Sequence, residues 1–362
     1  MSDHLPLFPA SADAAHDEAP QRFAFHGTGS EYFRIWIVNL FLSIVTLGIY
    51  SAWAKVRRTK YFYGSSTVAG SSFEYHGNPI AILKGRIVAF VLIVIYNIAM
   101  RTSGVLALLM MVAVMAVGPW LIWKSLQFKL YNSSYRSIRF GFRGSMKETY
   151  KVYLLWPLLT FFSLFLAAPF AHQRMKQFQH SESRFGTTHF SFHATASSFY
   201  RAYLLVFMIW LAGIVAISVV LGAGLWAFLS SMARPGTGDP AGLAGFFNFL
   251  FALYVWMFVL FPIFLTLLQN LIWNNTQLGA HKFTCEMKWP RMVFITLTNM
   301  LGIICTLGLF MPFATIRMLK YRVESMTLHP AGSLEEFVTN TQAQVSATGE
   351  GMADLLDFDL SL

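Results

Sequence analysis

The sequence predicts an all-α polytopic membrane protein with short cytoplasmic β-hairpins and internal repeats. Composition is the first observation, because 56% of the residues are hydrophobic and 12% are charged, whereas soluble domains carry about 25% charged residues. Second, several apolar runs approach the roughly 20 residues that a helix needs to cross a bilayer. Third, an apolar segment that ends in aromatic-Ala-x-x-Arg returns at residues 53–57, 170–174 and 313–317.

A repeated unit of about 117 residues organises the chain in two and a half copies. The copies occupy residues 21–130, 131–273 and 274–330, and the first two align without a gap at an offset of 117, which pairs Arg57 with Arg174. Each full copy contains a strand, a first apolar segment, a β-hairpin and two long apolar runs, and the third copy stops after its first apolar segment. Repetition over this length indicates a duplicated structural unit.

Local patterns predict the elements of the membrane domain, residues 21–330. Alternation that ends in glycine predicts a strand at 22–27, and an aromatic, Gly- and Ser-rich stretch predicts a hairpin at 60–78. The chain ends, residues 1–20 and 331–362, are acidic and contain no Lys or Arg, so we predict two disordered tails. The apolar segments lie at 32–53, 80–100, 104–123, 149–170, 203–230, 246–271 and 291–313.

Charge is distributed unevenly along the chain. All 27 basic residues lie within 21–330, together with 7 of the 17 acidic residues, so this domain carries a net charge of +20. A basic membrane domain is attracted to anionic lipid headgroups, and we expect a bilayer that contains anionic lipids as its partner. Nucleic-acid binding, the other common reason for a high isoelectric point, is not expected of so hydrophobic a chain.

The positive-inside rule predicts an unusual topology. Lys and Arg flank both ends of the first apolar segment in every copy, and only the turn at Arg101 and the loop at Arg234 are poor in them. We therefore predict that segments 32–53, 149–170 and 291–313 enter the membrane and return, which leaves four full spans and two cytoplasmic tails. The expected breaks are at 46–48, at Pro157 or 168–169, and at 306–308 or Pro312. The alternative is seven plain spans, because about 22 residues are enough to cross.

The candidate contacts for an anionic headgroup or solute lie where the first apolar segments end. A guanidinium group pairs bidentately with phosphate, but the aromatic neighbours equally favour a plain interfacial anchor. Asn39 and Asn299 are repeat-equivalent polar residues inside apolar segments, for which hydrogen bonding between helices is the default explanation. The candidate basic contacts are Arg57, Lys60, Arg174, Arg317 and Lys320.

Motifs for catalysis, metal binding and nucleotide binding are absent from the sequence, which contains no His-Glu-x-x-His, Cys-x-x-Cys or Gly-x-x-x-x-Gly-Lys-Ser/Thr. We predict no catalytic residue, no metal ligand and no cofactor, and we favour a protein that is not an enzyme. The leading functional prediction is a transporter or channel-like protein for an anionic or lipid-like solute. The alternatives are a non-transporting membrane scaffold that binds a cytoplasmic partner and a lipid-modifying enzyme.

Two stretches of the first copy, residues 25–27 (Phe-His-Gly) and 46–58 (Thr-Leu-Gly-Ile-Tyr-Ser-Ala-Trp-Ala-Lys-Val-Arg-Arg), support a family assignment. With them the sequence resembles the YjgN-like family of bacterial inner-membrane proteins over roughly 21–330. The family is a domain of unknown function, so the resemblance implies the bacterial inner membrane and supplies no catalytic residue. The second copy departs from the pattern, since Phe170 stands at the position of Trp53. A three-fold site built from the motif would therefore be asymmetric.

Overall fold

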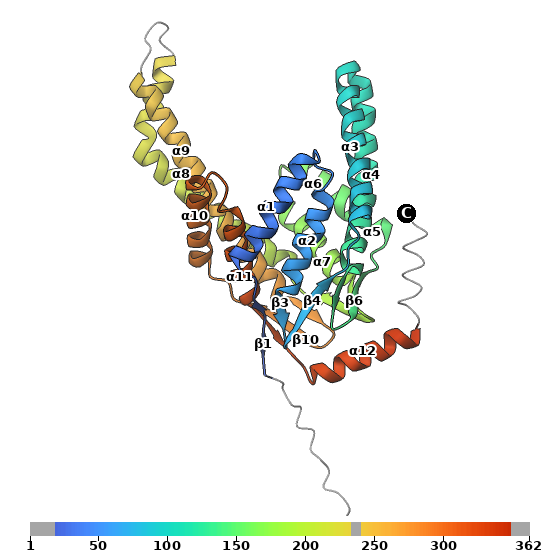
Figure 1. Ribbon diagram of the computed structural model, residues 1–362. Coiled ribbons are helices and arrows are strands. Elements are labelled where there is room, and N and C mark those ends of the chain that lie inside the picture. Colours follow the sequence, from blue (N-terminus) through green and yellow to red (C-terminus); the bar gives the residue numbers. More distant parts are fainter. Residues whose placement is uncertain (1–18, 233–239, 349–362) are drawn as a thin grey trace, which may run out of the picture.

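The computed structural model describes residues 19–232 and 240–348, and the predicted tail at 1–20 lies almost wholly outside them. The described chain alternates between strands and pairs of helices, with the strands gathered at one end and the helices projecting from it (Figure 1). The helices are α1 Gly29–Val45, α2 Ser51–Gly64, α3 Pro79–Thr102, α4 Gly104–Tyr131, α5 Met146–Tyr150, the π-helix η1 Lys151–Leu155, α6 Trp156–Phe162, α7 Ala168–Ser181, α8 Ala196–Met232, α9 Pro240–Trp273, α10 Trp289–Cys305, α11 Met311–Glu324 and α12 Leu334–Thr348.

The eleven strands of the described chain form one antiparallel sheet in the order β1-β11-β10-β9-β8-β7-β6-β5-β4-β3-β2. β1 and β2 are two halves of one extended segment, of which β1 pairs with β11 and β2 pairs with β3, so the sheet curls into a nearly closed barrel. The strands are β1 Gln21–Arg22, β2 Ala24–Phe25, β3 Ser66–Val68, β4 Ser71–Tyr75, β5 Ser133–Tyr135, β6 Ile138–Phe142, β7 Ser183–Phe185, β8 Thr188–Phe192, β9 Thr276–Leu278, β10 His281–Cys285 and β11 Met326–His329.

This sheet corrects the prediction of an all-α protein with separate short hairpins. The protein is mostly helical, but each hairpin also pairs with the next one, for example Phe73 of β4 with Tyr135 of β5, and Phe140 of β6 with Phe185 of β7. Pairing along the whole series leaves almost no exposed strand edge, which removes the usual liability of short isolated hairpins.

Aromatic side chains fill the barrel. Each ring of one set of five phenylalanines lies next to two others of the set, with neighbouring centroids 6.3–6.4 Å apart. The set is Phe23, Phe73, Phe140, Phe190 and Phe283. Val68, Ile138, Phe185, Leu278 and Leu328 belong to the same core and are at most 9% exposed. The barrel is therefore a packed core and not a pore.

Helix α12 closes the barrel mouth opposite the other helices (Figure 1). Phe337 stacks on Phe185 with centroids 6.2 Å apart, and the Thr341 side chain is 3% exposed. Residues 334–348 thus correct the prediction of a disordered tail at 331–362, because an amphipathic helix buries its apolar face on the barrel. The remainder of that tail lies outside the described residues.

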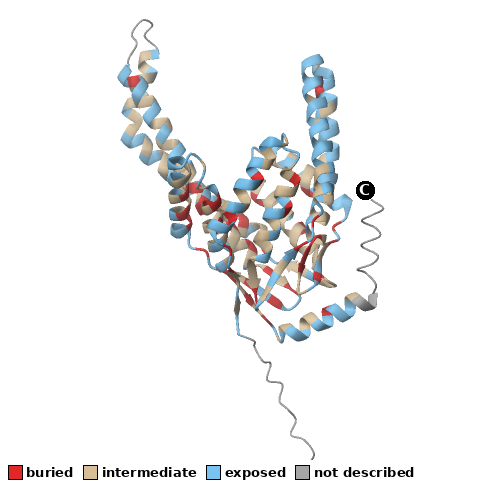
Figure 2. Cartoon of the chain, in the orientation of Figure 1, coloured by how far each residue is buried: buried red, intermediate tan, exposed pale blue. Residues whose placement is uncertain are grey.

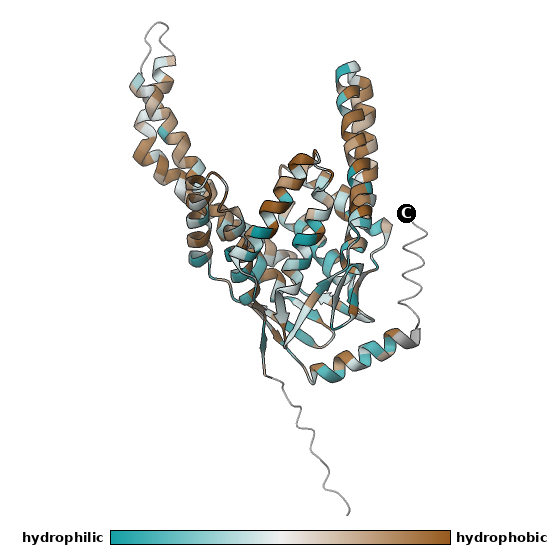
Figure 3. Cartoon of the chain, viewed as in Figure 1, coloured by the Kyte–Doolittle hydropathy of each residue, from teal (hydrophilic) through white to brown (hydrophobic). Residues whose placement is uncertain are grey.

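All five helical hairpins of the described chain leave the barrel at the same end, because each one connects two strands that lie side by side in the sheet. Two hairpins are long, α3/α4 and α8/α9, and they splay apart (Figure 1). By length and composition, their four helices are the ones in the described chain that could cross a membrane. Most of their surface is exposed (Figure 2), and it is apolar (Figure 3), as a lipid-facing surface requires.

The other three hairpins are short, and in two of them a threonine forms the turn. Thr46 Oγ1 donates to Leu42 O at 2.7 Å and accepts from the Tyr50 amide at 2.9 Å, so one side chain caps the end of α1 and the start of α2. Thr306 makes the same pair of bonds between α10 and α11. These turns confirm the predicted breaks at 46–48 and 306–308.

In the second short hairpin the turn lies at 163–167, between the two predicted positions. Pro157 directly follows the π-helix η1 within the continuous helical run 146–162, and Pro169 lies in the first turn of α7, so neither proline forms the turn. The residues at the three tips are leucines with φ near +50° that are 83–96% exposed. An exposed apolar tip is stabilised by contact with lipid rather than with water. The tips are Leu47, Leu164 and Leu307.

Candidate functional site

A pocket of about 300 Å³ lies where α1 and α2 meet α3 and α11. We call it the headgroup pocket. Its polar lining comes from separate elements: Asn39 from α1, Lys55 and Arg58 from α2, and Arg86 from α3. Trp36 and Leu40 are among its apolar walls. No acidic side chain is among its lining residues.

Three cations therefore share the headgroup pocket without a carboxylate in its wall. Partial burial lowers the pKa of Lys55 below its usual value, and the positive charges of Arg86, Arg58 and Lys129 lower it further. Arg86 donates to the Ser51 hydroxyl, which in turn donates to the carbonyl of the first hairpin turn. An anion in this pocket would relieve the mutual repulsion and raise the pKa of Lys55.

Asn39 is the most unusual group in the pocket wall. Its side chain is only 7% exposed, and its Oδ1 has no hydrogen-bond partner. A buried acceptor without a donor costs roughly 1–3 kcal/mol. The repeat-equivalent Asn299 is satisfied, since its Nδ2 donates to Ala314 O at 3.1 Å and its Oδ1 accepts from Arg317 Nη1 at 2.8 Å.

The three equivalent arginines occupy three different environments. Arg317 binds Asn299 and, at 3.2 Å, the hydroxyl of Thr298 inside the third short hairpin. Arg174 lies 5.1 Å from the centre of the Phe170 ring and donates to Gln177. Arg57 is exposed on α2. Among the described residues these three side chains share no contact partner, and their role as solute contacts stays a prediction.

The other predicted contacts are also dispersed. Lys60 is exposed on α2, and Lys320 pairs with Glu324 at 3.7 Å on the surface of α11. The basic cluster that the structure does contain, Lys55, Arg58 and Arg86, was not predicted. Two of its three members could have been grouped from the sequence. Lys55 and Arg58 are three residues apart and so share one face of a helix. Arg86 comes from another helix, and only the fold brings it to that face.

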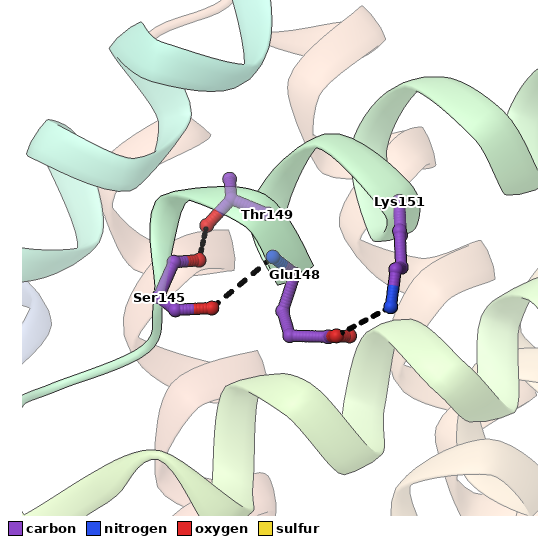
Figure 4. A network of polar contacts seen from close by, with 4 residues as sticks. All are labelled: Ser145, Glu148, Thr149 and Lys151. Atoms are coloured by element: carbon purple, nitrogen blue, oxygen red, sulfur yellow. Dashed lines mark hydrogen bonds and ion pairs between the residues drawn. The ribbon is translucent and has the colours of Figure 1, made fainter.

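The acidic residues at the hairpin starts are structural. Ser145 caps α5 by accepting from the Glu148 amide at 3.2 Å, Thr149 donates back to Ser145 O at 2.9 Å, and Lys151 pairs with the Glu148 carboxylate at 2.7 Å (Figure 4). In the first copy the equivalent Glu31 accepts from the Tyr61 hydroxyl, which lowers the pKa of that carboxyl group.

Two further hollows lie outside this site. A larger, more open groove of about 670 Å³ follows the start of α10 beside Trp289 and Arg291, and an apolar one of about 280 Å³ lies between α4 and η1–α6 around Pro119 and Pro157. Neither has a deeply buried polar group without a partner in its wall. Within residues 19–232 and 240–348, no three His, Cys, Asp or Glu side chains are grouped so as to hold a metal ion.

Comparison with known proteins agrees with this architecture. Residues 20–355 match the family described as bacterial protein of unknown function, DUF898. An inner membrane protein YjgN from Escherichia coli K12 is 34% identical over 148 residues, which are 40% of this chain and 36% of the relative. YjgN from Salmonella typhimurium is 27% identical over 154 residues, 42% of this chain and 39% of the relative.

The matched stretches thus span well under half of these curated relatives. The comparison with solved structures found no match.

Proposed function

Because the chain belongs to the DUF898 family of bacterial proteins, we propose that it is a multi-pass protein of the bacterial inner membrane that binds the anionic headgroup of a lipid-like solute. The observation that carries this proposal is the headgroup pocket, in which three cations converge beside an apolar surface, with no acidic side chain in the wall. The relatives named as inner membrane proteins support the location.

The arrangement of the hairpins supports four spans rather than seven. α1 begins after β2 and α2 ends before β3, and these two strands pair with each other, so both ends of the first short hairpin lie at the barrel. The same holds for the other four hairpins. If α3/α4 and α8/α9 cross the membrane, the barrel and both ends of the described chain lie on the same side of the membrane. The positive-inside rule assigns that side to the cytoplasm.

The headgroup pocket then lies near the membrane surface on the cytoplasmic side. A cavity of about 300 Å³ holds a headgroup but not the acyl chains of a phospholipid. Exposed apolar side chains of the first short hairpin, including Phe41 and Ile44 at 65% each, offer a surface for those chains. The position suits a lipid that stays partly in the bilayer while the basic residues hold its phosphate.

For activity, we propose a carrier of an anionic amphiphile in preference to an open channel. The five-phenylalanine set packs within the barrel and α12 covers one of its mouths, so a route would run along the helical hairpins instead. The alternative function, a membrane scaffold for a cytoplasmic partner, has less support, because in the described sheet only the two-residue strands β1 and β2 have an unpaired side for a partner strand to join.

We also propose that the hairpins arose by duplication. In support, the three short hairpins share their turn geometry: the hydroxyl residue before each leucine tip is Thr46, Ser163 or Thr306, and each accepts a hydrogen bond from the amide four residues later. The three short hairpins differ in their surroundings, because the headgroup pocket lies beside the first of them.

The test of headgroup binding uses purified full-length protein in nanodiscs and measures retained phosphatidylglycerol against phosphatidylcholine by native mass spectrometry. Replacing Lys55, Arg58 and Arg86 together by Gln removes the cations of the pocket. We expect the preference for the anionic lipid to fall at least tenfold, because loss of one charge-assisted hydrogen bond worth about 1.4 kcal/mol already corresponds to tenfold.

A matched control removes the same number of charges from the same two helices. Arg57, Lys60 and Lys84 are exposed on α2 and α3 and do not line the headgroup pocket, so their triple Gln variant should keep the preference. Equal losses in the two triple variants would mean that the basic surface as a whole attracts anionic lipid, and the pocket would lose its assigned role.

A further inference from the structure

The wall of the headgroup pocket carries more positive charge than a phosphodiester neutralises. Lys55 and Arg58 of α2 and Arg86 of α3 line it, and none of its lining residues is acidic, so the formal charge of the wall is +3. The phosphodiester of a lipid brings a single negative charge, which would leave the wall at +2. A second negative charge on the ligand is therefore attracted by the same three side chains.

The neighbouring groups add to this charge and do not balance it. Lys129 of α4 lies outside the lining, and its positive charge joins those of the pocket arginines in lowering the pKa of Lys55. From α1 the titratable group in the wall is the hydroxyl of Tyr32, and α11 contributes the uncharged Met311 and Thr315. No lining residue thus supplies the counter-charge that the cations lack.

The hydrogen-bond donors of the pocket favour the same kind of ligand. A phosphomonoester presents three strong acceptor oxygens and up to two negative charges at neutral pH, whereas esterification to a second alcohol removes one of those oxygens and one charge. A guanidinium group has five N–H donors, so Arg86 keeps donors besides the one that it gives to Ser51. Arg58 offers a second guanidinium fork and Lys55 a compact positive charge.

Resting on the proposed function, we propose that the headgroup pocket selects a lipid that ends in a phosphomonoester over a lipid whose phosphate is a diester. The three oxygens of the terminal phosphate would accept hydrogen bonds from Lys55, Arg58 and Arg86, one cation for each oxygen. The second negative charge would then lie against a wall that has none of its own. Phosphatidic acid is the simplest lipid with this chemistry.

The experiment compares phosphatidic acid with phosphatidylmethanol, the methyl ester of the same phosphate, with identical acyl chains and full-length protein in nanodiscs. We expect about a tenfold preference for phosphatidic acid at about pH 8, which corresponds to about 1.4 kcal/mol. Shared among three cations this is about 0.5 kcal/mol each, the size of an exposed ion pair. A phosphomonoester takes up its second proton near pH 6, so at about pH 5 the preference should fall to near unity.

Phosphatidylmethanol also serves as the control for the protein. Its charge does not change over this pH range, so any change in its own binding reports titration of the pocket and is divided out of the ratio. In the double variant Lys55→Gln/Arg58→Gln one cation remains, and the preference at about pH 8 should fall to about twofold, the cube root of tenfold. The matched variant Arg57→Gln/Lys60→Gln removes two exposed charges of α2 outside the lining and should keep the preference.

Each outcome separates the inference from the function on which it rests. Equal binding of the two anionic lipids by the wild type at about pH 8, a preference that persists at about pH 5, or equal losses in the two double variants overturns the selection and leaves headgroup binding intact. Binding of both lipids no better than that of phosphatidylcholine overturns headgroup binding itself. Competition by free glycerol phosphate as strong as that of phosphatidic acid would overturn the lipid as the source of the phosphate. The wild-type comparison stands even where a variant fails to fold.

Discussion

Removing the Arg317 side chain should destabilise the protein far more than removing that of the equivalent Arg57. Arg317 donates to Asn299 Oδ1 at 2.8 Å and to the Thr298 hydroxyl at 3.2 Å, and Asn299 is only 4% exposed. Arg317→Ala therefore leaves a buried oxygen without a donor and removes a charge-assisted bond, a loss of about 1.5–3 kcal/mol. Arg57 is exposed, so Arg57→Ala should stay within about 0.5 kcal/mol.

Unfolding of both variants in detergent, followed by tryptophan fluorescence against temperature and denaturant, measures the difference. The double variant Arg317→Ala/Asn299→Leu removes the orphaned oxygen together with its donor, so it should recover part of the loss, with a coupling energy of about 1 kcal/mol or more. If Arg57→Ala and Arg317→Ala unfold alike, or if the coupling is zero, then the bond inside the third hairpin does not stabilise it and both residues act as interfacial anchors.

Three further predictions concern the barrel, one histidine and the topology. Phe140→Ala should cost about 3–5 kcal/mol, because it opens a cavity inside the five-phenylalanine set, and denaturant unfolding measures this. Burial lowers the pKa of His180 to about 4. As the pH falls below about 6.5, the imidazole is therefore protonated in the unfolded chain but stays neutral in the folded protein. The free energy of unfolding should drop by about 1–2 kcal/mol between pH 7 and pH 5. His180→Asn should remove that part of the pH dependence in thermal unfolding. Cysteines introduced at Ser65 and Asn340 should react with an impermeant thiol reagent from one side of the membrane, and a cysteine at Ser103 should react from the other.

The outcomes that contradict these predictions are distinct. A loss for Phe140→Ala no greater than for Phe90→Ala, whose side chain is 66% exposed on α3, would mean that the barrel is not a packed core. An identical pH profile for His180→Asn would mean that this imidazole is not held neutral by burial. Labelling at 65 and 340 from opposite sides would support seven spans. Cys305 is exposed, so the labelling begins from a variant that lacks it.

Much of the candidate site could not be predicted from the sequence, for a physical reason. Lys55 and Arg58 share a helix face, which helical periodicity reveals, but the repeat alignment singles out Arg57 and carries no information about the direction of its side chain. Arg86 reaches the pocket only because α3 packs on α2. The unpaired Oδ1 of Asn39, like the pairing of Asn299 with Arg317, depends on side-chain directions that no sequence pattern encodes.

The sequence by itself predicted the membrane character, the apolar segments, the strand at 22–27 and two of the three hairpin breaks, because hydropathy, alternation and turn residues are local properties. Only the tertiary structure decided that the strands join into one barrel, that α12 packs on its mouth and that three cations meet beside Asn39. These features depend on contacts between residues far apart in the chain, such as Phe23 with Phe283. Long-range pairing curls the sheet into a nearly closed barrel, and both ends of each described hairpin lie at that barrel.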